Sequence, residues 1–140
     1  MTEAPSSYCA EHYPDDPTVA DGADLLRRIP PNHVIYDENL KQHRPSSQAF
    51  RDDRDGDPMS VYLSPVLVSE NRELSAVLTG HQGFALAAVT AGLARSLSQT
   101  VHPDPIPEES SHAVVCGDKE SGSRRVARTL AKAAVWVVRP

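Results

Sequence analysis

One stretch of the chain, Thr79–Gln99, constrains the fold more than any other part. Between Phe84 and Ala94 the only polar side chain is that of Thr90. A span that is apolar on all sides and rich in Ala and Leu is typical of a helix buried all round. Thr79 and Gln82 fit a capping box at its start. The sequence therefore predicts a buried central helix over about 80–98.

Apolar patterns elsewhere predict short strands and two amphipathic helices. The strands are expected at His33–Tyr36, Met59–Leu63, His112–Cys116 and Val135–Arg139. The helices are expected at Gly22–Ile29, capped by Asp21, and from Arg124 to about Ala134, capped by Ser123. The segment Val101–Ser111 holds three prolines within five residues and is expected to form no regular element. These elements predict an α+β domain, in which a sheet of about four short strands packs on the central helix and the amphipathic C-terminal helix.

Length and composition indicate one small domain with an N-terminal arm. The chain has 140 residues, which is the size of a single domain. Residues 1–20 combine prolines and acids with few apolar side chains, so we expect a disordered or loosely docked arm, followed by one α+β domain over 21–140. No run reaches the roughly 18 apolar residues of a membrane span, and no signal peptide is visible at the N-terminus. Cys9 and Cys116 are interpreted as two isolated thiols, so neither a disulfide framework nor a cysteine-rich zinc site is expected. The expected location is a reducing cytoplasm.

Charge is distributed unevenly along the chain. From Lys119 to the end there are six basic residues and one acid, a net charge of +5. The remainder must carry −10, because the whole chain carries −5. Such an asymmetry indicates a solvated basic face packed beside an acidic one, or a docking surface for an acidic partner.

Patterns that would hold a metal are incomplete. The six histidines include no pair at i, i+4 and no metalloprotease pattern. The run Asp52–Asp57 places Asp53 and Asp55 as an EF-hand loop would, with Gly56 at the sixth position. Arg51 and Tyr62, however, occupy positions where that loop needs ligands. The run is interpreted as a turn, and no metal or cofactor is predicted.

Two short motifs could hold an anion. Arg44 is followed by a proline-fixed turn and two hydroxyls, Ser46 and Ser47, which together could bind a phosphate or a carboxylate. The alternative is that one serine only caps the following turn. Gly80–Gly83 would open the central helix, where free N–H groups attract anions, and His81 would stand there as an acid/base group. The alternative is a polar surface turn, and His112, at the start of an expected strand, is a further acid/base candidate.

Two long phrases of the sequence resemble a known set of proteins. The phrases are RPSSQAF followed by DGDPMSVYL, and GHQGFALAAVTAGLARSL followed by HAVV and a basic helix ending in WVV. They resemble a group of small, uncharacterised bacterial proteins, over roughly residues 25–140. The resemblance implies a bacterial origin and one compact domain, but no activity.

Two functions from different classes follow from these patterns. The first is a non-catalytic accessory module of a bacterial multi-protein system, acting through protein–protein contact. The second is an enzyme or sensor for a phosphorylated small molecule or nucleotide, with Arg44, Ser46 and Ser47 and the Gly80–Gly83 turn as the anion site and His81 or His112 as acid/base. Whether the chain is an enzyme is left open, as are its oligomeric state and its partner. A nucleic-acid partner is disfavoured by the acidic charge and the few aromatic residues.

Overall fold

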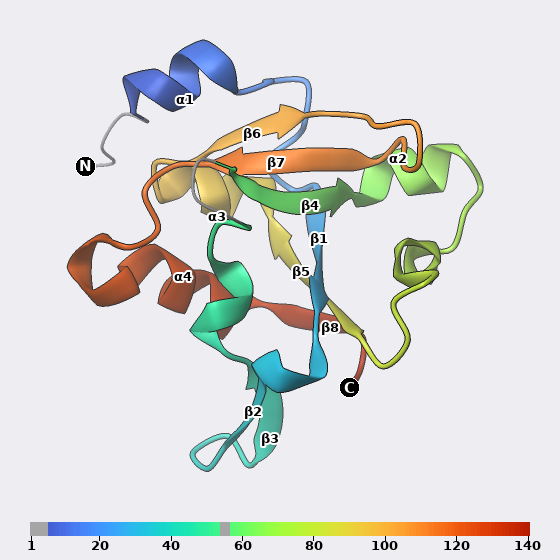
Figure 1. Ribbon diagram of the computed structural model, residues 1–140, viewed down its shortest axis with the longest axis vertical. Coiled ribbons are helices and arrows are strands. Elements are labelled where there is room, and N and C mark those ends of the chain that lie inside the picture. The colour runs from blue at the N-terminus through green and yellow to red at the C-terminus, as the bar shows by residue number, and fades with distance from the viewer. Residues whose placement is uncertain (1–5, 54–56) are drawn as a thin grey trace.

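A six-stranded antiparallel sheet with the order β6-β7-β4-β1-β5-β8 organises the structure (Figure 1). The computed structural model describes residues 6–53 and 57–140. The sheet consists of β1 (Asp24–Ile29), β4 (Met59–Leu63), β5 (Ala85–Thr90), β6 (Thr100–Pro103), β7 (His112–Cys116) and β8 (Val135–Val138). A separate hairpin pairs β2 (Val34–Asp37) with β3 (Gln42–Pro45). The helices are α1 (Ser7–His12), α2 (Ser64–Ser69), α3 (Ala91–Ser96) and α4 (Ser121–Ala133), with 3₁₀ turns η1 (Pro31–His33), η2 (Ser47–Phe50) and η3 (Leu74–Leu78).

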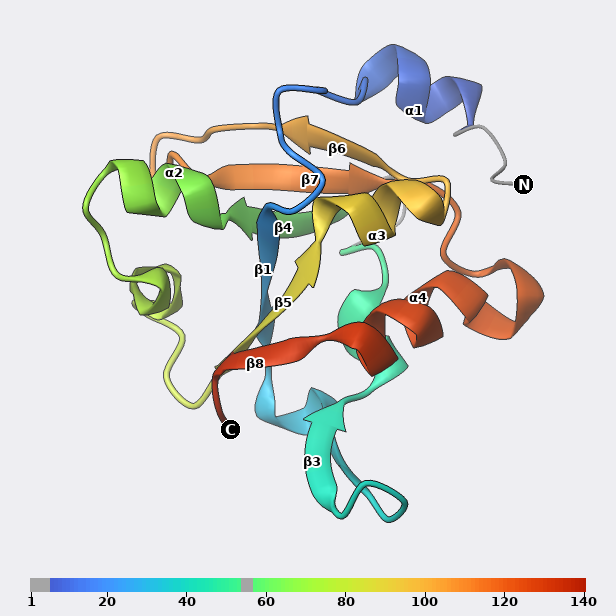
Figure 2. The same cartoon turned by 180° about the vertical axis from the view of Figure 1, so that it is seen from behind.

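The sheet carries apolar side chains on both faces. On one face, Leu25, Val61 and Ala87 belong to the larger buried cluster, which α4 and η2 complete. On the other face, Leu26 and Leu86 belong to a smaller cluster that α2 and η3 complete. Figures 1 and 2 show that β4, β6 and β7 run across β1 and β5. The predicted α+β class is therefore confirmed, with six strands in the sheet where the sequence predicts about four.

The predicted central helix over 80–98 is wrong. Residues Ala85–Thr90 form strand β5, and only Ala91–Ser96 are helical. The strand lies between β1 and β8 with five of its six residues buried, so both faces are apolar and no alternation marks it as a strand. The predicted capping box at Thr79 is also absent, because Thr90 caps α3 by accepting a hydrogen bond from the Leu93 amide at 3.1 Å.

The expected helix over Gly22–Ile29 is wrong for a similar reason. Asp24–Ile29 form strand β1, in which Leu25 and Leu26 are buried in the two clusters on opposite faces. The spacing of Leu25, Leu26 and Ile29 also fits the apolar stripe of a helix, so the pattern favours the helical period over the two-residue period of a strand. The strand expected at Met59–Leu63 is confirmed, and so is the placement of Met59, Val61 and Leu63 on one face.

The N-terminal segment is connected to the sheet through several contacts. Helix α1 is joined to β7 by a disulfide between Cys9 and Cys116, which corrects the expectation of two isolated thiols. The two cysteines are 107 residues apart, so no sequence spacing links them. Beyond α1, the amide of Asp16 donates to the Val101 carbonyl at 3.0 Å. Val101 belongs to strand β6, so part of the segment expected to be irregular is in the sheet.

Close approach of the chain explains the small residue at position 92. The Gly92 amide donates to the Asp21 carbonyl at 2.8 Å. A Cβ at position 92 would lie 3.0 Å from the Asp21 Cβ and 3.1 Å from its carbonyl oxygen. The residues before β1 and the start of α3 therefore meet at a distance that favours glycine.

Candidate functional site

The site forms where β1 and β4 separate. The two strands pair only at Leu25–Leu63 and Leu26–Tyr62, whereas β1 pairs with β5 over six residues. Where the backbone pairing of β1 with β4 ends, the side chain of Arg27 donates hydrogen bonds to backbone carbonyl groups instead. Its Nε donates to the Ala49 carbonyl at 2.8 Å and its Nη1 to the Ser60 carbonyl at 2.7 Å. Arg27 also pairs with Asp53 at 2.9 Å, so its charge is compensated.

Three adjoining cavities lie around this separation. The first, of about 530 Å³, is called the Arg28 cavity; it is lined by Arg28, Tyr62, Arg72, Ala76, Val77, Thr79, His81, Ile106, Glu108 and Glu109. The second, of about 370 Å³, is called the central cavity and shares Arg28, Tyr62 and His81 with the first. The third, of about 220 Å³, is called the Asp104 cavity and shares Asp53 and Ser60 with the central one. The three cavities share walls, and together they are called the groove.

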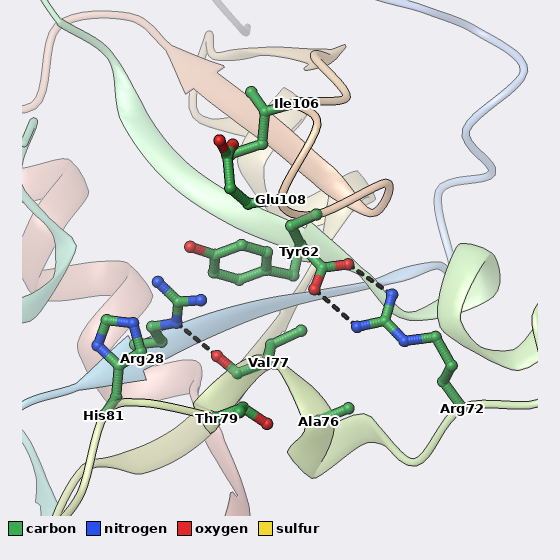
Figure 3. Close-up of a pocket in the computed structure, with 10 residues that line it drawn as sticks. Arg28, Tyr62, Arg72, Ala76, Val77, Thr79, His81, Ile106 and Glu108 are labelled. Carbon is green, nitrogen blue, oxygen red and sulfur yellow. Dashed lines mark hydrogen bonds and ion pairs between the residues drawn. The ribbon is translucent and has the colours of Figure 1, made fainter.

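Arg28 is held in a fixed position in this groove. Its Nε donates to the Val77 carbonyl at 2.7 Å, and its guanidinium carbon lies 4.4 Å from the centroid of the Tyr62 ring. Figure 3 shows Arg28 beside Tyr62 and His81 at one end of the Arg28 cavity. In the part of the chain that the structure describes, no carboxylate forms an ion pair with Arg28. Its charge is therefore available to a ligand.

Two histidines near the arginines are held neutral. Burial lowers the pKa of His81, and the charge of Arg28 lowers it further. Burial likewise lowers the pKa of His33 in the central cavity, with a further contribution from Arg27. Near pH 7 both imidazoles are thus uncharged and can donate or accept one hydrogen bond with each nitrogen. Burial raises the pKa of Tyr62, so its hydroxyl stays protonated over the same range.

The far end of the Arg28 cavity is formed by a bidentate ion pair. Arg72 donates to the two carboxylate oxygens of Glu109, each at 2.7 Å (Figure 3). These hydrogen bonds lower the pKa of Glu109 to about 2. Ser111 adds a hydroxyl donor at 2.7 Å to the same carboxylate. The two charges compensate each other, which leaves Arg28 and the exposed Glu108 as the uncompensated charges around this cavity.

Ser60 and His112 are joined where the central and Asp104 cavities meet. The Nε2 of His112 lies 3.0 Å from the Oγ of Ser60. The Nδ1 of His112 lies 2.8 Å from the backbone carbonyl of Asp104 and 3.4 Å from its carboxylate. The Asp104 cavity is also lined by Asp57 and by Asp53, the carboxylate that pairs with Arg27. Carboxylates thus line this part of the groove, whereas Arg28 lines both the Arg28 cavity and the central cavity.

The predicted anion site at Gly80–Gly83 needs correction. No helix begins there, because this segment is the turn before β5, with Gly80 and Gly83 at φ of 83° and 84°. The helix N-terminus that would hold an anion is therefore missing from this position. His81, from the same turn, nevertheless lines both the Arg28 cavity and the central cavity.

Arg44, Ser46 and Ser47 line a different cavity, of about 170 Å³, called the Arg44 cavity. Arg44 donates to the Asp37 carboxylate at 2.7 Å, so its charge is compensated. The remaining walls include Arg128 and Lys132 of α4. The buried Oγ of Ser46 has no hydrogen-bond partner among the described residues. The structure therefore groups the Arg44 motif with α4, and places His81 and His112 around the groove instead.

Sequence reasoning missed several residues of the groove. Arg28, Ser60 and Tyr62 lie in strands, and Asp104 follows β6, so only the strand pairing brings them together. The one available signal was alternation in β4, where Ser60 and Tyr62 occupy the face opposite the apolar residues.

Two features are absent from the described ranges 6–53 and 57–140. They contain no cluster of three or more His, Cys, Asp or Glu side chains that could hold a metal ion. They also contain no helix long and apolar enough to cross a membrane. Asp55 and Gly56 of the calcium interpretation lie outside the described residues.

Comparison of the chain with protein-family profiles, curated proteins and solved structures found no match.

Proposed function

We propose that this protein binds a small molecule carrying a phosphate or a carboxylate group, with that group bound to Arg28. The observation that carries the proposal is the Arg28 guanidinium, which is fixed by Val77 and Tyr62 and has no carboxylate partner among the described residues. The cavity it lines, of about 530 Å³, has the size of a small-molecule site. Neutral His81 and the Tyr62 hydroxyl lie in the same wall and supply further hydrogen bonds.

The carboxylates around the groove favour a ligand with a second, different group. Asp53, Asp57 and Asp104 border the third cavity, and Glu108 lies at the rim of the first. Carboxylates accept hydrogen bonds, so hydroxyl or amine groups of the ligand would fit there. The expected ligand class is therefore a small phosphate or carboxylate with polar donor groups, such as a sugar phosphate or a nucleotide.

A titration monitored by NMR tests this function. The probes are glucose 6-phosphate, AMP and citrate, added to the ¹⁵N-labelled protein, with uncharged glucose as the control. Shift changes concentrated at Arg28, Tyr62 and His81 are expected with at least one anionic probe and absent with glucose. Shifts spread over exposed cations such as Arg125, without any at the groove, would contradict the proposal.

A second candidate is the accessory module that acts through protein contact. Arg128 and Lys132 are exposed on α4, and no described acid forms an ion pair with either. Beside them lies the buried, unpartnered Oγ of Ser46. An acidic side chain of a partner, or a phosphate, would fit Ser46, Ser47 and these two cations. The test is binding of an Asp- and Glu-rich peptide, which Arg128→Gln with Lys132→Gln should abolish.

The cytoplasmic location and the bacterial origin stay predictions from the sequence. The disulfide between Cys9 and Cys116 counts against a reducing compartment, because such bonds persist mainly where the surroundings are oxidising. Detection of the bond in protein isolated from its host under thiol-blocking conditions would contradict a reducing cytoplasmic location.

A further inference from the structure

We infer that Ser60 is a nucleophile and His112 its general base, so that the groove hydrolyses a small ester. The inference rests on the proposed function in one respect: the anionic group of the ester is the group that Arg28 binds. The serine and histidine themselves are assigned from their own contacts.

The tautomer of His112 follows from its hydrogen bonds. A backbone carbonyl can only accept, so the Nδ1 that lies 2.8 Å from the Asp104 carbonyl must carry the proton. In the neutral imidazole, Nε2 is then an acceptor. The Ser60 hydroxyl, 3.0 Å away, must therefore donate to Nε2. This arrangement, with a nucleophile donating to a base whose other nitrogen is oriented by a third group, is the one that activates serine.

Access to Ser60 is provided by two cavities. The residue is partly exposed and lines both the central cavity and the Asp104 cavity. Arg28 lines the central cavity with it and supplies positive charge for an oxyanion beside Ser60. Around His112 lie the Tyr62 ring, at 5.9 Å between centroids, and the carboxylates of Asp53, Asp57 and Asp104.

The reaction consumes only the ester and one water molecule. The Ser60 Oγ attacks the ester carbonyl carbon while its proton passes to His112 Nε2. The bond from that carbon to the alcohol oxygen breaks, and the alcohol leaves with the proton from Nε2. Water then adds to the acyl-serine with His112 again accepting a proton. The bond between Oγ and the acyl carbon breaks, which restores Ser60 and releases the carboxylic acid.

The test uses an uncharged alkyl fluorophosphonate on the intact, oxidised protein. Attack by Ser60 forms an Oγ–P bond and expels fluoride, so mass spectrometry should find one adduct at Ser60. Ser60→Ala should carry none, whereas Ser75→Ala, which changes an exposed serine of η3, should label like the wild type. His112→Gln should slow labelling about 100-fold or more.

Several results would overturn the inference. One is a correctly folded wild type in which Ser60 is not labelled ahead of other serines. Another is a His112→Gln variant that labels at the wild-type rate. Asp104→Ala retains the backbone carbonyl and should label within a few-fold of the wild type, so a complete loss in a folded variant would contradict orientation by that carbonyl. Because the probe is uncharged, labelling needs no bound anion, so a wild type that is labelled at Ser60 but binds none of the anionic probes would overturn the proposed function and leave this inference standing. The failure of one proposal can thus be distinguished from the failure of the other.

Discussion

The guanidinium of Arg28 lies 4.4 Å from the centroid of the Tyr62 ring while its Nε donates to the Val77 carbonyl. The two residues come from the neighbouring strands β1 and β4, and Val77 comes from η3 on the same face. A cation over an aromatic face is stabilised without being neutralised. Arg28 is therefore fixed in place but keeps its charge for a ligand.

The ring of Tyr62 should matter more than its hydroxyl. Tyr62→Leu removes the aromatic face, and the free energy of unfolding should fall by about 1–2 kcal/mol. Tyr62→Phe keeps the ring and should lie within about 0.5 kcal/mol of the wild type. Urea denaturation measures both variants. Equal losses for the two substitutions would show that Arg28 does not depend on the ring.

Acid should remove the contribution of Glu109 to stability. Its pKa is lowered to about 2, mainly by the hydrogen bonds from Arg72, so the folded state favours the ionised carboxylate. That contribution is complete above the ordinary pKa of glutamate, near 4.5, and is lost as the pH falls toward 2. Glu109→Gln should therefore be less stable than the wild type at pH 7, and the difference should shrink between pH 4.5 and 2. Denaturant titrations at several pH values test this, and a difference that grows on acidification would contradict it.

Reduction of the disulfide should destabilise the fold. A cross-link between residues 107 apart stabilises by about 5 kcal/mol if chain entropy dominates. A thiol-reactive dye should find no free thiol in the unfolded, oxidised protein and two after reduction. The melting temperature should fall with reductant in the wild type and stay constant in a Cys9→Ser, Cys116→Ser double variant. Two reactive thiols without reductant would contradict the bond.

Glycine should be favourable at position 124. Arg124 adopts φ of 63° and ψ of 40°, in the left-handed region, within a turn at the start of α4 that also includes Gly122 and Ser123. This conformation costs a non-glycine residue about 1–2 kcal/mol. Arg124→Gly should stabilise the protein by about 1 kcal/mol, whereas Arg125→Gly, in the regular part of the helix, should destabilise it by a similar amount. Opposite signs in thermal denaturation are the expected result, and two equal losses would contradict it.

The sequence predicts correctly the strands that are flanked by clear turn residues. Met59–Leu63 and His112–Cys116 alternate or run apolar between turn residues, and both are strands in the structure. The assignment failed at β5 because burial on both faces removes the alternation, so that an Ala-rich strand resembles a helix. It failed at β1 because Leu25, Leu26 and Ile29 fit either period.

The groove was predictable only in its isolated residues. The sequence singles out His81, at the start of a predicted helix, and His112, at the start of a predicted strand, as acid/base candidates, but their neighbours Arg28 and Ser60 lie in strands far away in the sequence. Contacts of this kind depend on the strand order and on the separation of β1 from β4, which no local pattern encodes. The Arg44 motif, in contrast, lies together in one cavity because its residues are adjacent in the chain.

The most direct test of the central claim is the affinity of an anionic ligand for Arg28→Gln, measured by isothermal titration calorimetry. The ligand is whichever of glucose 6-phosphate, AMP and citrate binds the wild type most tightly. Loss of a hydrogen-bonded charge at this position should weaken binding at least about 10-fold. The matched control Arg125→Gln removes an exposed cation outside the groove and should bind like the wild type. Equal affinities of the wild type and Arg28→Gln would contradict the assignment of the groove as the anion site.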